Sequence, residues 1–145
     1  MRLRNLGVLV ALGALLPLTS SAQDQWETEV RAQLTMIEAL VESEGYTRYG
    51  NVTVDSMRDD ATDTFTVRLQ GGHNYKIIGV CDTDCGDIDF VIYDEDGDKI
   101  DEDVSTDDVP IVSVSPRWDA KYELRVKMYD CTQNPCRYGI LQMQD

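Results

Sequence analysis

The sequence predicts an all-β fold, an antiparallel β-sandwich preceded by one amphipathic α-helix. Up to residue 44 the apolar residues recur at helical spacing, whereas from Tyr46 onward they recur at every second position. Turn signals such as Gly71-Gly72 and Asp96-Gly97 separate the short apolar runs. Roughly seven or eight short strands with a single helix are typical of a sandwich, because two sheets are needed to bury their apolar faces.

Residues 1–22 have the features of a secretory signal peptide. Two arginines precede an apolar run over residues 6–18, and small residues follow up to Ala22. The apolar run is shorter than the roughly 20 residues that span a bilayer. We therefore expect an exported protein, periplasmic or secreted, that is not inserted in a membrane after cleavage.

Composition limits the partners of the mature chain. Removing 22 of the 145 residues leaves 123, enough for one domain with a hydrophobic core. The removed segment holds two arginines and no acid, so the 13 basic residues fall to 11 against 27 acidic ones, a net charge of −16. A charge of this sign opposes binding to nucleic acid and to anionic lipid.

Residues 23–45 are predicted to form the N-terminal amphipathic helix, with its helical part over residues 24–44 and Gly45 as its stop. The apolar stripe consists of Trp26, Val30, Leu34, Ile37, Leu40 and Val41. Two roles remain open for this stripe. It packs on the domain that follows, or it serves as a dimer seam or docks on a partner.

Residues 46–145 are predicted to form the β-sandwich domain. The candidate strands are residues 51–57, 63–70, 75–81, 87–93, 99–104, 109–114, 120–128 and 138–143. Residues 120–128 give the clearest alternation, with Tyr122, Leu124, Val126 and Met128 facing inward and Lys121, Glu123, Arg125 and Lys127 facing outward. Residues 99–104 are short and acidic, which suits an edge strand.

The four cysteines fall into two close pairs, Cys81/Cys85 and Cys131/Cys136. An exported chain meets an oxidising compartment, where such pairs form disulfides. Zinc sites usually place two residues between paired cysteines, whereas the gaps here are three and four residues. Three pairings are possible, and we expect the local one, in which each bridge closes a short loop between strands.

Three short motifs, in order, resemble the bacterial pre-peptidase C-terminal domain. They are G-D-I-D-F-V-I-Y-D-E-D-G-D-K-I, then Y-E-L-R-V, then Y-G-I-L, and the resemblance covers residues 62–142. It implies a jelly-roll-like β-sandwich that acts as a non-catalytic module of secreted hydrolases, in secretion, in processing or in contact with large substrates. This sequence departs from the pattern in its leading helix and its two cysteine pairs, and no catalytic domain accompanies it.

Acidic residues are concentrated between residues 82 and 108, where 13 carboxylates face a single base, Lys99. Calcium takes oxygen ligands on loops and would offset the repulsion among these charges. The preferred ligands are Asp82, Asp84 and Asp87, and the second set is Asp94, Asp96 and Asp98. An EF-hand is excluded, since counting from Asp94 puts Gly97 at the fourth position and Ser105 at the twelfth. The alternative is that these aspartates end strands and cap turns.

Catalytic chemistry finds little support in the sequence. His73 is the only histidine, it lies between Gly72 and Asn74 in a predicted turn, and no G-x-S-x-G motif accompanies it. Abundant acids on turns do not indicate the cleft that a glycosidase needs. Trp118, in a predicted loop, is either an exposed contact residue or the cover of one end of the sandwich.

We therefore expect a non-catalytic binding or accessory module without a cofactor, except that calcium is possible. Its partner would be a protein or a polysaccharide at the cell envelope. The alternative function is an interaction protein that dimerises or docks through the helix over residues 24–44, and a small hydrolase ranks third.

Overall fold

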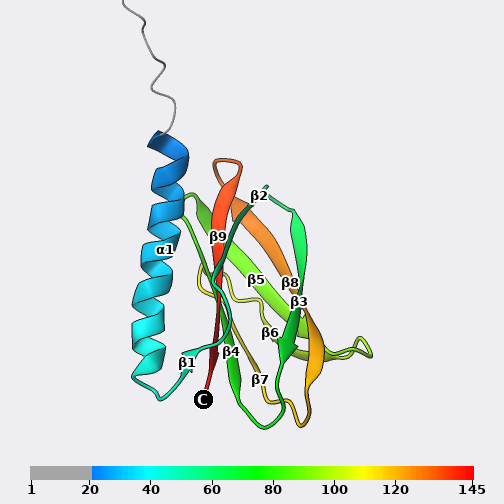
Figure 1. The fold of residues 1–145 in the computed structure, drawn as a ribbon. Helices are drawn as coiled ribbons and strands as arrows, with labels where there is room; N and C mark the ends of the chain where they lie inside the picture. The colour runs from blue at the N-terminus through cyan, green and yellow to red at the C-terminus, as the bar shows by residue number, and fades with distance from the viewer. Residues whose placement is uncertain (1–20) are drawn as a thin grey trace, which may run out of the picture.

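A computed structural model describes the backbone of residues 21–145 and the side chains from Gln25 onward (Figure 1). The predicted signal peptide therefore lies almost wholly outside the described residues. The elements are α1 (Ser21–Glu42), β1 (Thr47–Arg48), β2 (Thr53–Met57), β3 (Thr62–Leu69), β4 (Tyr75–Cys81), β5 (Cys85–Tyr93), β6 (Lys99–Asp103), β7 (Ile111–Val114), β8 (Ala120–Cys131) and β9 (Cys136–Gln144).

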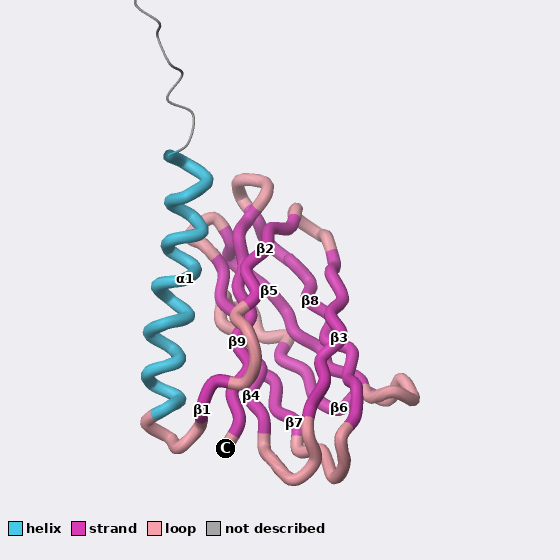
Figure 2. The backbone as a smooth tube through the Cα atoms, in the orientation of Figure 1, coloured by secondary structure: helices cyan, strands magenta, loops and turns pink. Residues whose placement is uncertain are grey.

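The strands form two antiparallel sheets, which confirms the predicted all-β sandwich with one preceding helix. One sheet has the order β1-β9-β4-β7, with β2 also paired to β9, and we call it the helix-covered sheet. The other has the order β3-β8-β5-β6, and we call it the open sheet. Helix α1 runs along the outside of the sandwich beside β9 and β4 (Figures 1 and 2).

The main hydrophobic core lies between the two sheets. The open sheet contributes the residues predicted to face inward, including Ile88, Phe90 and Ile92 of β5. In β8, Leu124, Val126 and Met128 are fully buried, as the alternation predicts, and Tyr122 is half-buried against the same core. The charged residues between them line the outer face, where Arg125 is exposed.

A second, smaller core joins α1 to the outer face of the helix-covered sheet. Val30, Leu34 and Val41 are buried there. Their neighbours on the sheet are Ile78 and Val80 of β4 and Leu141 and Met143 of β9. Side chains of the helix pack directly on the backbone of β9 at Gly139, where a Cβ atom would lie 2.6 Å from Cδ1 of Leu34.

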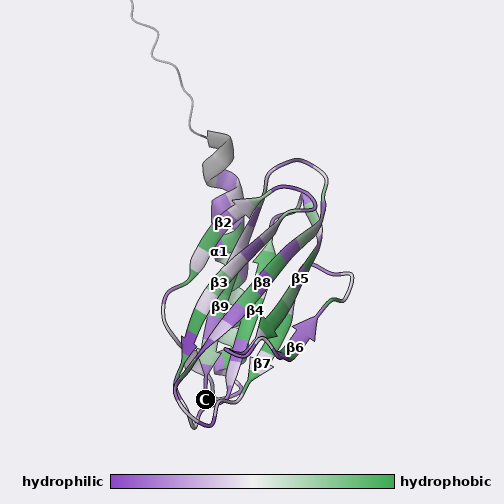
Figure 3. Ribbon diagram, turned by 90° about the vertical axis from the view of Figure 1, so that its right-hand side faces the viewer, coloured by the Kyte–Doolittle hydropathy of each residue, from purple (hydrophilic) through white to green (hydrophobic). Residues whose placement is uncertain are grey.

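This second core explains a difference between strands. β4 and β9, at the centre of the helix-covered sheet, are buried on both faces, so they carry nearly continuous apolar runs. In the open sheet, β8 is covered on one face only, so it alternates between buried and exposed positions. Figure 3 colours the strands by hydropathy, from purple for hydrophilic residues to green for hydrophobic ones.

Some predicted bounds differ from the structure. The helix begins at Ser21 and ends at Glu42, whereas the sequence predicts residues 24–44. Leu40 is not part of the buried stripe and is 62 % exposed, because the sheet covers a narrower arc of the helix than six residues span. β8 and β9 each extend to their cysteine, at Cys131 and Cys136, since the ladder continues up to the disulfide loop.

Strand β6 is an edge strand, as predicted, and it also protects a neighbouring edge. Two carboxylates of β6 accept hydrogen bonds from backbone N–H groups of β7, Asp103 from Ile111 at 3.0 Å and Asp101 from Ser113 at 2.7 Å. β7 is the last strand of the other sheet, so these side chains satisfy donors that a sheet edge leaves unpaired. Some of the acidic residues between 82 and 108 thus have a structural role.

Candidate functional site

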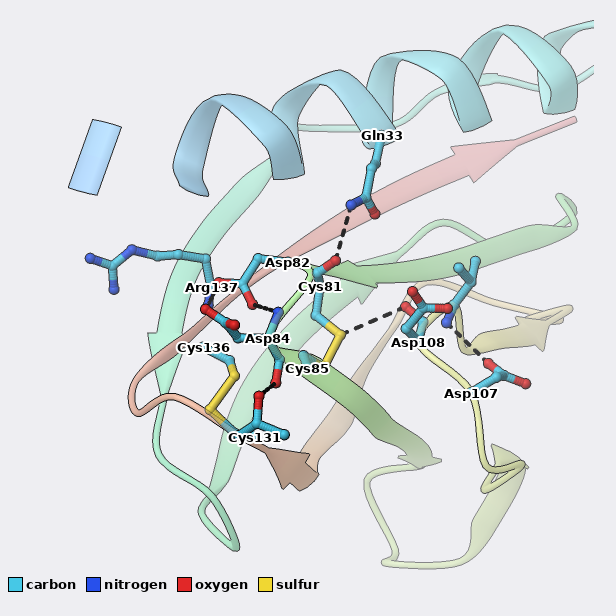
Figure 4. The surroundings of a disulfide bond; sticks show 12 residues. Gln33, Cys81, Asp82, Asp84, Cys85, Asp107, Asp108, Cys131, Cys136 and Arg137 are labelled. Carbon is cyan, nitrogen blue, oxygen red and sulfur yellow. Dashed lines mark hydrogen bonds between the residues drawn. A yellow bond between two sulfur atoms is a disulfide. The ribbon is translucent and has the colours of Figure 1, made fainter. Parts of the chain in front are cut away.

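The two predicted disulfides, Cys81–Cys85 and Cys131–Cys136, are present and lie at the same end of the sandwich (Figure 4). The pairing of β5 with β8 places Cys85 opposite Cys131, so the two loops are neighbours. The carbonyl oxygen of Asp84 accepts hydrogen bonds from the backbone N–H and the hydroxyl of Thr132, at 2.8 and 2.9 Å. The disulfide loops therefore form one connected unit.

Asp82 holds this unit to β9. Its side chain is buried, one oxygen accepts the backbone N–H of Arg137 at 2.6 Å, and the other accepts that of Asp84 at 3.3 Å. Burial raises the pKa of Asp82, and the two hydrogen bonds oppose that rise. Asp84 in turn accepts a hydrogen bond from the side-chain amide of Gln133 at 3.1 Å. Both carboxylates serve the loop structure itself.

The structure does not bring the predicted calcium ligands together as a set. Among residues 21–145, no three His, Cys, Asp or Glu side chains converge as a metal-binding group. In the second predicted set, Asp94 accepts the backbone N–H groups of Asp96 and Asp98 at 3.0 and 2.9 Å, which shapes the turn between β5 and β6. The calcium site at either set remains a prediction.

Asp87 has a different neighbour, Asp89, which is two residues further along β5. The two carboxyl groups lie within hydrogen-bonding reach of each other, and one oxygen of each is buried without a hydrogen-bond partner among the described residues. Burial, then the charges of Asp87 and Asp103, raise the pKa of Asp89 to about 6. Burial and the charges of Asp107 and Asp130 also raise the pKa of Asp87.

The disulfides give a first testable prediction. Replacing Cys131 and Cys136 together by alanine should lower the free energy of unfolding by about 2 kcal/mol, because the bridge closes a short loop that restricts the unfolded chain. Urea unfolding under non-reducing conditions measures the difference. Under reducing conditions the unfolding free energies of the variant and the wild type should differ much less. If they still differed by about 2 kcal/mol, the lost stability would not come from the bridge.

The opposite end of the sandwich carries an exposed tryptophan. Trp118 is 71 % exposed, so this residue does not cover the core, and a role as a contact residue stays a prediction. The backbone of Trp118 packs directly on Gly71, where a Cβ atom would lie 2.5 Å from Cα of Trp118. This close contact fixes the loop between β7 and β8 against the turn that follows β3.

Two adjoining hollows lie beside Trp118, with volumes of about 370 and 240 Å³. They share Glu95 and Ala120 in their linings, and Trp118 lines the smaller one; we call the two hollows together the tryptophan-end trough. Trp118, Tyr122 and Tyr49 provide its aromatic surface. Its charged side chains are three bases and four acids, namely Arg68, Arg117 and Lys121 with Asp94, Glu95, Asp96 and Asp119.

The trough is thus nearly balanced in charge, whereas the whole chain has a net charge of −14. Two of its acids hold neighbouring backbone: Asp119 accepts the N–H of Gly71 at 2.9 Å and Glu95 that of Lys121 at 3.3 Å. The hydroxyl of Tyr49 donates to the carbonyl of Arg68 at 3.1 Å. The walls are therefore held in place by hydrogen bonds, which suits a preformed binding surface.

His73 lies in the predicted turn, beside the last residue of the chain. Its Nδ1 is 3.0 Å from the backbone carbonyl of Asp145, and the side chain is partly exposed. The outward basic residues of β8 have acidic partners, as expected for a solvated face: Lys127 contacts Asp60 at 3.0 Å and Arg125 contacts Glu123 at 2.8 Å.

Comparison with known proteins adds no assignment, since the sequence matches no protein-family model and no curated protein. The resemblance to the pre-peptidase C-terminal domain therefore stays a prediction. Among the residues that the structure describes, no helix combines the length and apolarity needed to span a membrane.

Sequence reasoning missed two features of these sites. It counted Asp89 among the acids without singling it out, although Asp89 alternates with Ile88 and Phe90 on a strand and therefore lies beside Asp87 on the other face. It also weighed Trp118 alone. Tyr49 and Glu95 come from distant parts of the chain, and only the sheet pairing places them around the same trough.

Proposed function

We propose that this protein is a non-catalytic binding module of the cell envelope or the extracellular space, and that the tryptophan-end trough is its contact surface. The observation that carries the proposal is Trp118, which is 71 % exposed beside a trough with polar walls. Tryptophan is enriched among the residues that dominate binding energy, because it buries a large rigid surface at low cost in conformational entropy.

The partner we favour is a polysaccharide of the envelope. A flat aromatic ring can stack on the C–H face of a sugar, and the surrounding charged and amide side chains supply hydrogen bonds to hydroxyl groups. The near balance of charge in the trough suits an uncharged polar ligand better than a nucleic acid or a strongly acidic one. An envelope protein is the other partner that such a surface could take.

Two disulfides indicate an oxidising, extracytoplasmic environment. We propose export through the predicted signal peptide over residues 1–22 to the periplasm or the medium. No cofactor is needed for binding of this kind. Calcium would act as a stabilising ion, because oxygen ligands held on loops restrain those loops when the ion binds.

Replacing Trp118 by alanine tests the contact surface. Wild-type protein should sediment with a bacterial envelope fraction, and the variant should bind about tenfold or more weakly, since loss of one central tryptophan commonly costs over 1 kcal/mol. Its free energy of unfolding should stay within about 0.5 kcal/mol of the wild type, because the side chain is exposed.

Treating the envelope fraction with protease before the assay separates the two kinds of partner. Retained binding identifies a polysaccharide, and lost binding identifies a protein. The proposal fails if the wild type does not sediment, or if the Trp118 variant sediments equally well.

A second candidate function is docking through the helix. Met36 and Leu40 of α1 are 66 % and 62 % exposed, which leaves an apolar strip on the solvent side. Of the rest of the predicted stripe, Val30, Leu34 and Val41 are buried on the sheet and Ile37 packs partly buried beside them. We rank this function second, because the buried residues already give the helix a structural role.

A further inference from the structure

The outer face of β5 carries two acids that share one buried location. Asp87 and Asp89 lie on the side opposite Ile88 and Phe90, which face the core. Asp89 is only 8 % exposed, and its Oδ1 is buried without a hydrogen-bond partner among the described residues. Oδ1 of Asp87 is in the same situation, and the two carboxyl groups lie within hydrogen-bonding reach of each other.

The loop between β6 and β7 runs beside this pair, along the edge of β5. The backbone N–H of Ile88, between the two acids, donates to the carbonyl of Asp107 at 3.1 Å. The loop keeps its shape through side chains that accept its own backbone N–H groups, such as Asp107 from Val109 at 3.0 Å. Beside this loop Asp89 is buried, whereas Asp87 is partly exposed.

No base of the neighbouring strand neutralises the pair. Lys127 of β8 is in register with Asp89, yet its ammonium group donates to the carbonyl and the carboxylate of Asp60, at 2.5 and 3.0 Å. The charged groups that raise the pKa values of the pair are further acids, from β6, the β6–β7 loop and β8: Asp103, Asp107 and Asp130. A buried carboxylate pair without a counterion is costly, so a cation from solution would stabilise it.

We propose that Asp87 and Asp89 form a calcium-binding site, with the ion held between their two unpartnered oxygens beside the β6–β7 loop. Hard oxygen ligands and a surrounding negative field are what calcium requires. Two carboxylates leave the other coordination positions to water, which agrees with the lack of any three converging acidic side chains among residues 21–145. Such a site belongs to the weak class of extracellular modules, with a dissociation constant of about 0.1–1 mM.

This site differs from both sets predicted from the sequence, since it keeps Asp87 and replaces Asp82 and Asp84 by Asp89. The reason is that Asp82 and Asp84 already accept hydrogen bonds from Arg137 and Gln133. The proposal does not depend on the tryptophan-end trough, which lies at the other end of the sandwich.

Thermal unfolding with calcium tests the site. In protein first treated with a chelator, about 10 mM calcium should raise the melting temperature of the wild type by about 5 °C if the dissociation constant is near 1 mM. The same concentration of magnesium should give a smaller rise, because magnesium gives up its bound water reluctantly and requires shorter bonds in near-ideal octahedral geometry. Asp89→Asn should abolish the calcium shift.

Two matched variants locate the ion. Asp84→Asn and Asp96→Asn remove one carboxylate from each set predicted from the sequence, and both should keep the full calcium shift. The melting temperature of each variant in chelator shows that it folds. Absence of a calcium shift in the wild type, a shift that survives in Asp89→Asn, or a shift lost in Asp84→Asn would each overturn the proposal.

Discussion

Replacing Leu34 by alanine is expected to lower the free energy of unfolding by about 2–5 kcal/mol, the range measured for deletion of a buried leucine side chain. Leu34 is almost fully buried, and it lies against Gly139 of β9 with no room for a Cβ atom between them. Truncation would therefore leave a cavity between α1 and the helix-covered sheet. Urea unfolding followed by circular dichroism measures the loss.

Met36→Ala is the matched control, since Met36 lies two residues along the same helix but is 66 % exposed. Its unfolding free energy should change by no more than about 0.5 kcal/mol. If Leu34→Ala had an equally small effect, the helix would not be part of the folded unit. The packing described here would then be wrong.

Replacing Asp89 by asparagine is expected to raise stability by about 2–3 kcal/mol at neutral pH in the absence of calcium, from a pKa difference of about two units. The folded protein holds the Asp89 proton up to about pH 6, whereas the unfolded chain releases it near pH 3.8. This carboxyl therefore favours folding at acid pH, and its contribution is lost as the pH rises through about 6. An asparagine amide stays uncharged and can donate to Asp87.

Chemical unfolding at several pH values between about 4 and 8, in chelator, measures this effect. The gap between the variant and the wild type should be small near about pH 4, widen as the pH rises to about 6 and stay constant above it. The groups that face Asp89 are Asp87, Asp103 and Asp107, and they add to the repulsion above that pH. A variant that is less stable than the wild type at neutral pH would contradict the account.

The sequence was sufficient to predict the sandwich, the helix and the disulfide pairing, because each depends on local patterns. Alternation in β8 follows from one exposed face, and the short spacing of Cys131 and Cys136 permits a local bridge. The sequence of β4 also indicates that the outer face of its sheet is covered. The run Ile77-Ile78-Gly79-Val80 is apolar without alternation, which is typical of a strand buried on both faces.

The sites were less predictable, because they depend on contacts between distant segments. The preference for Asp82 and Asp84 as ligands came from their place beside a cysteine loop, but each side chain is already used in hydrogen bonds across that loop. Asp89 is buried on the outer face of β5, close to acids of β6 and of the β6–β7 loop. Charge counting alone gives no indication of which acid is buried there.

The most direct test of the proposed function compares the two exposed surfaces in one sedimentation assay with bacterial envelope. A Trp118→Ala variant alters the tryptophan-end trough, and a Met36→Ala, Leu40→Ala double variant alters the exposed strip of α1. We expect the double variant to sediment like the wild type and the Trp118 variant to remain in the supernatant. The opposite result, loss of binding in the helix variant alone, would contradict the account and assign the function to the helix.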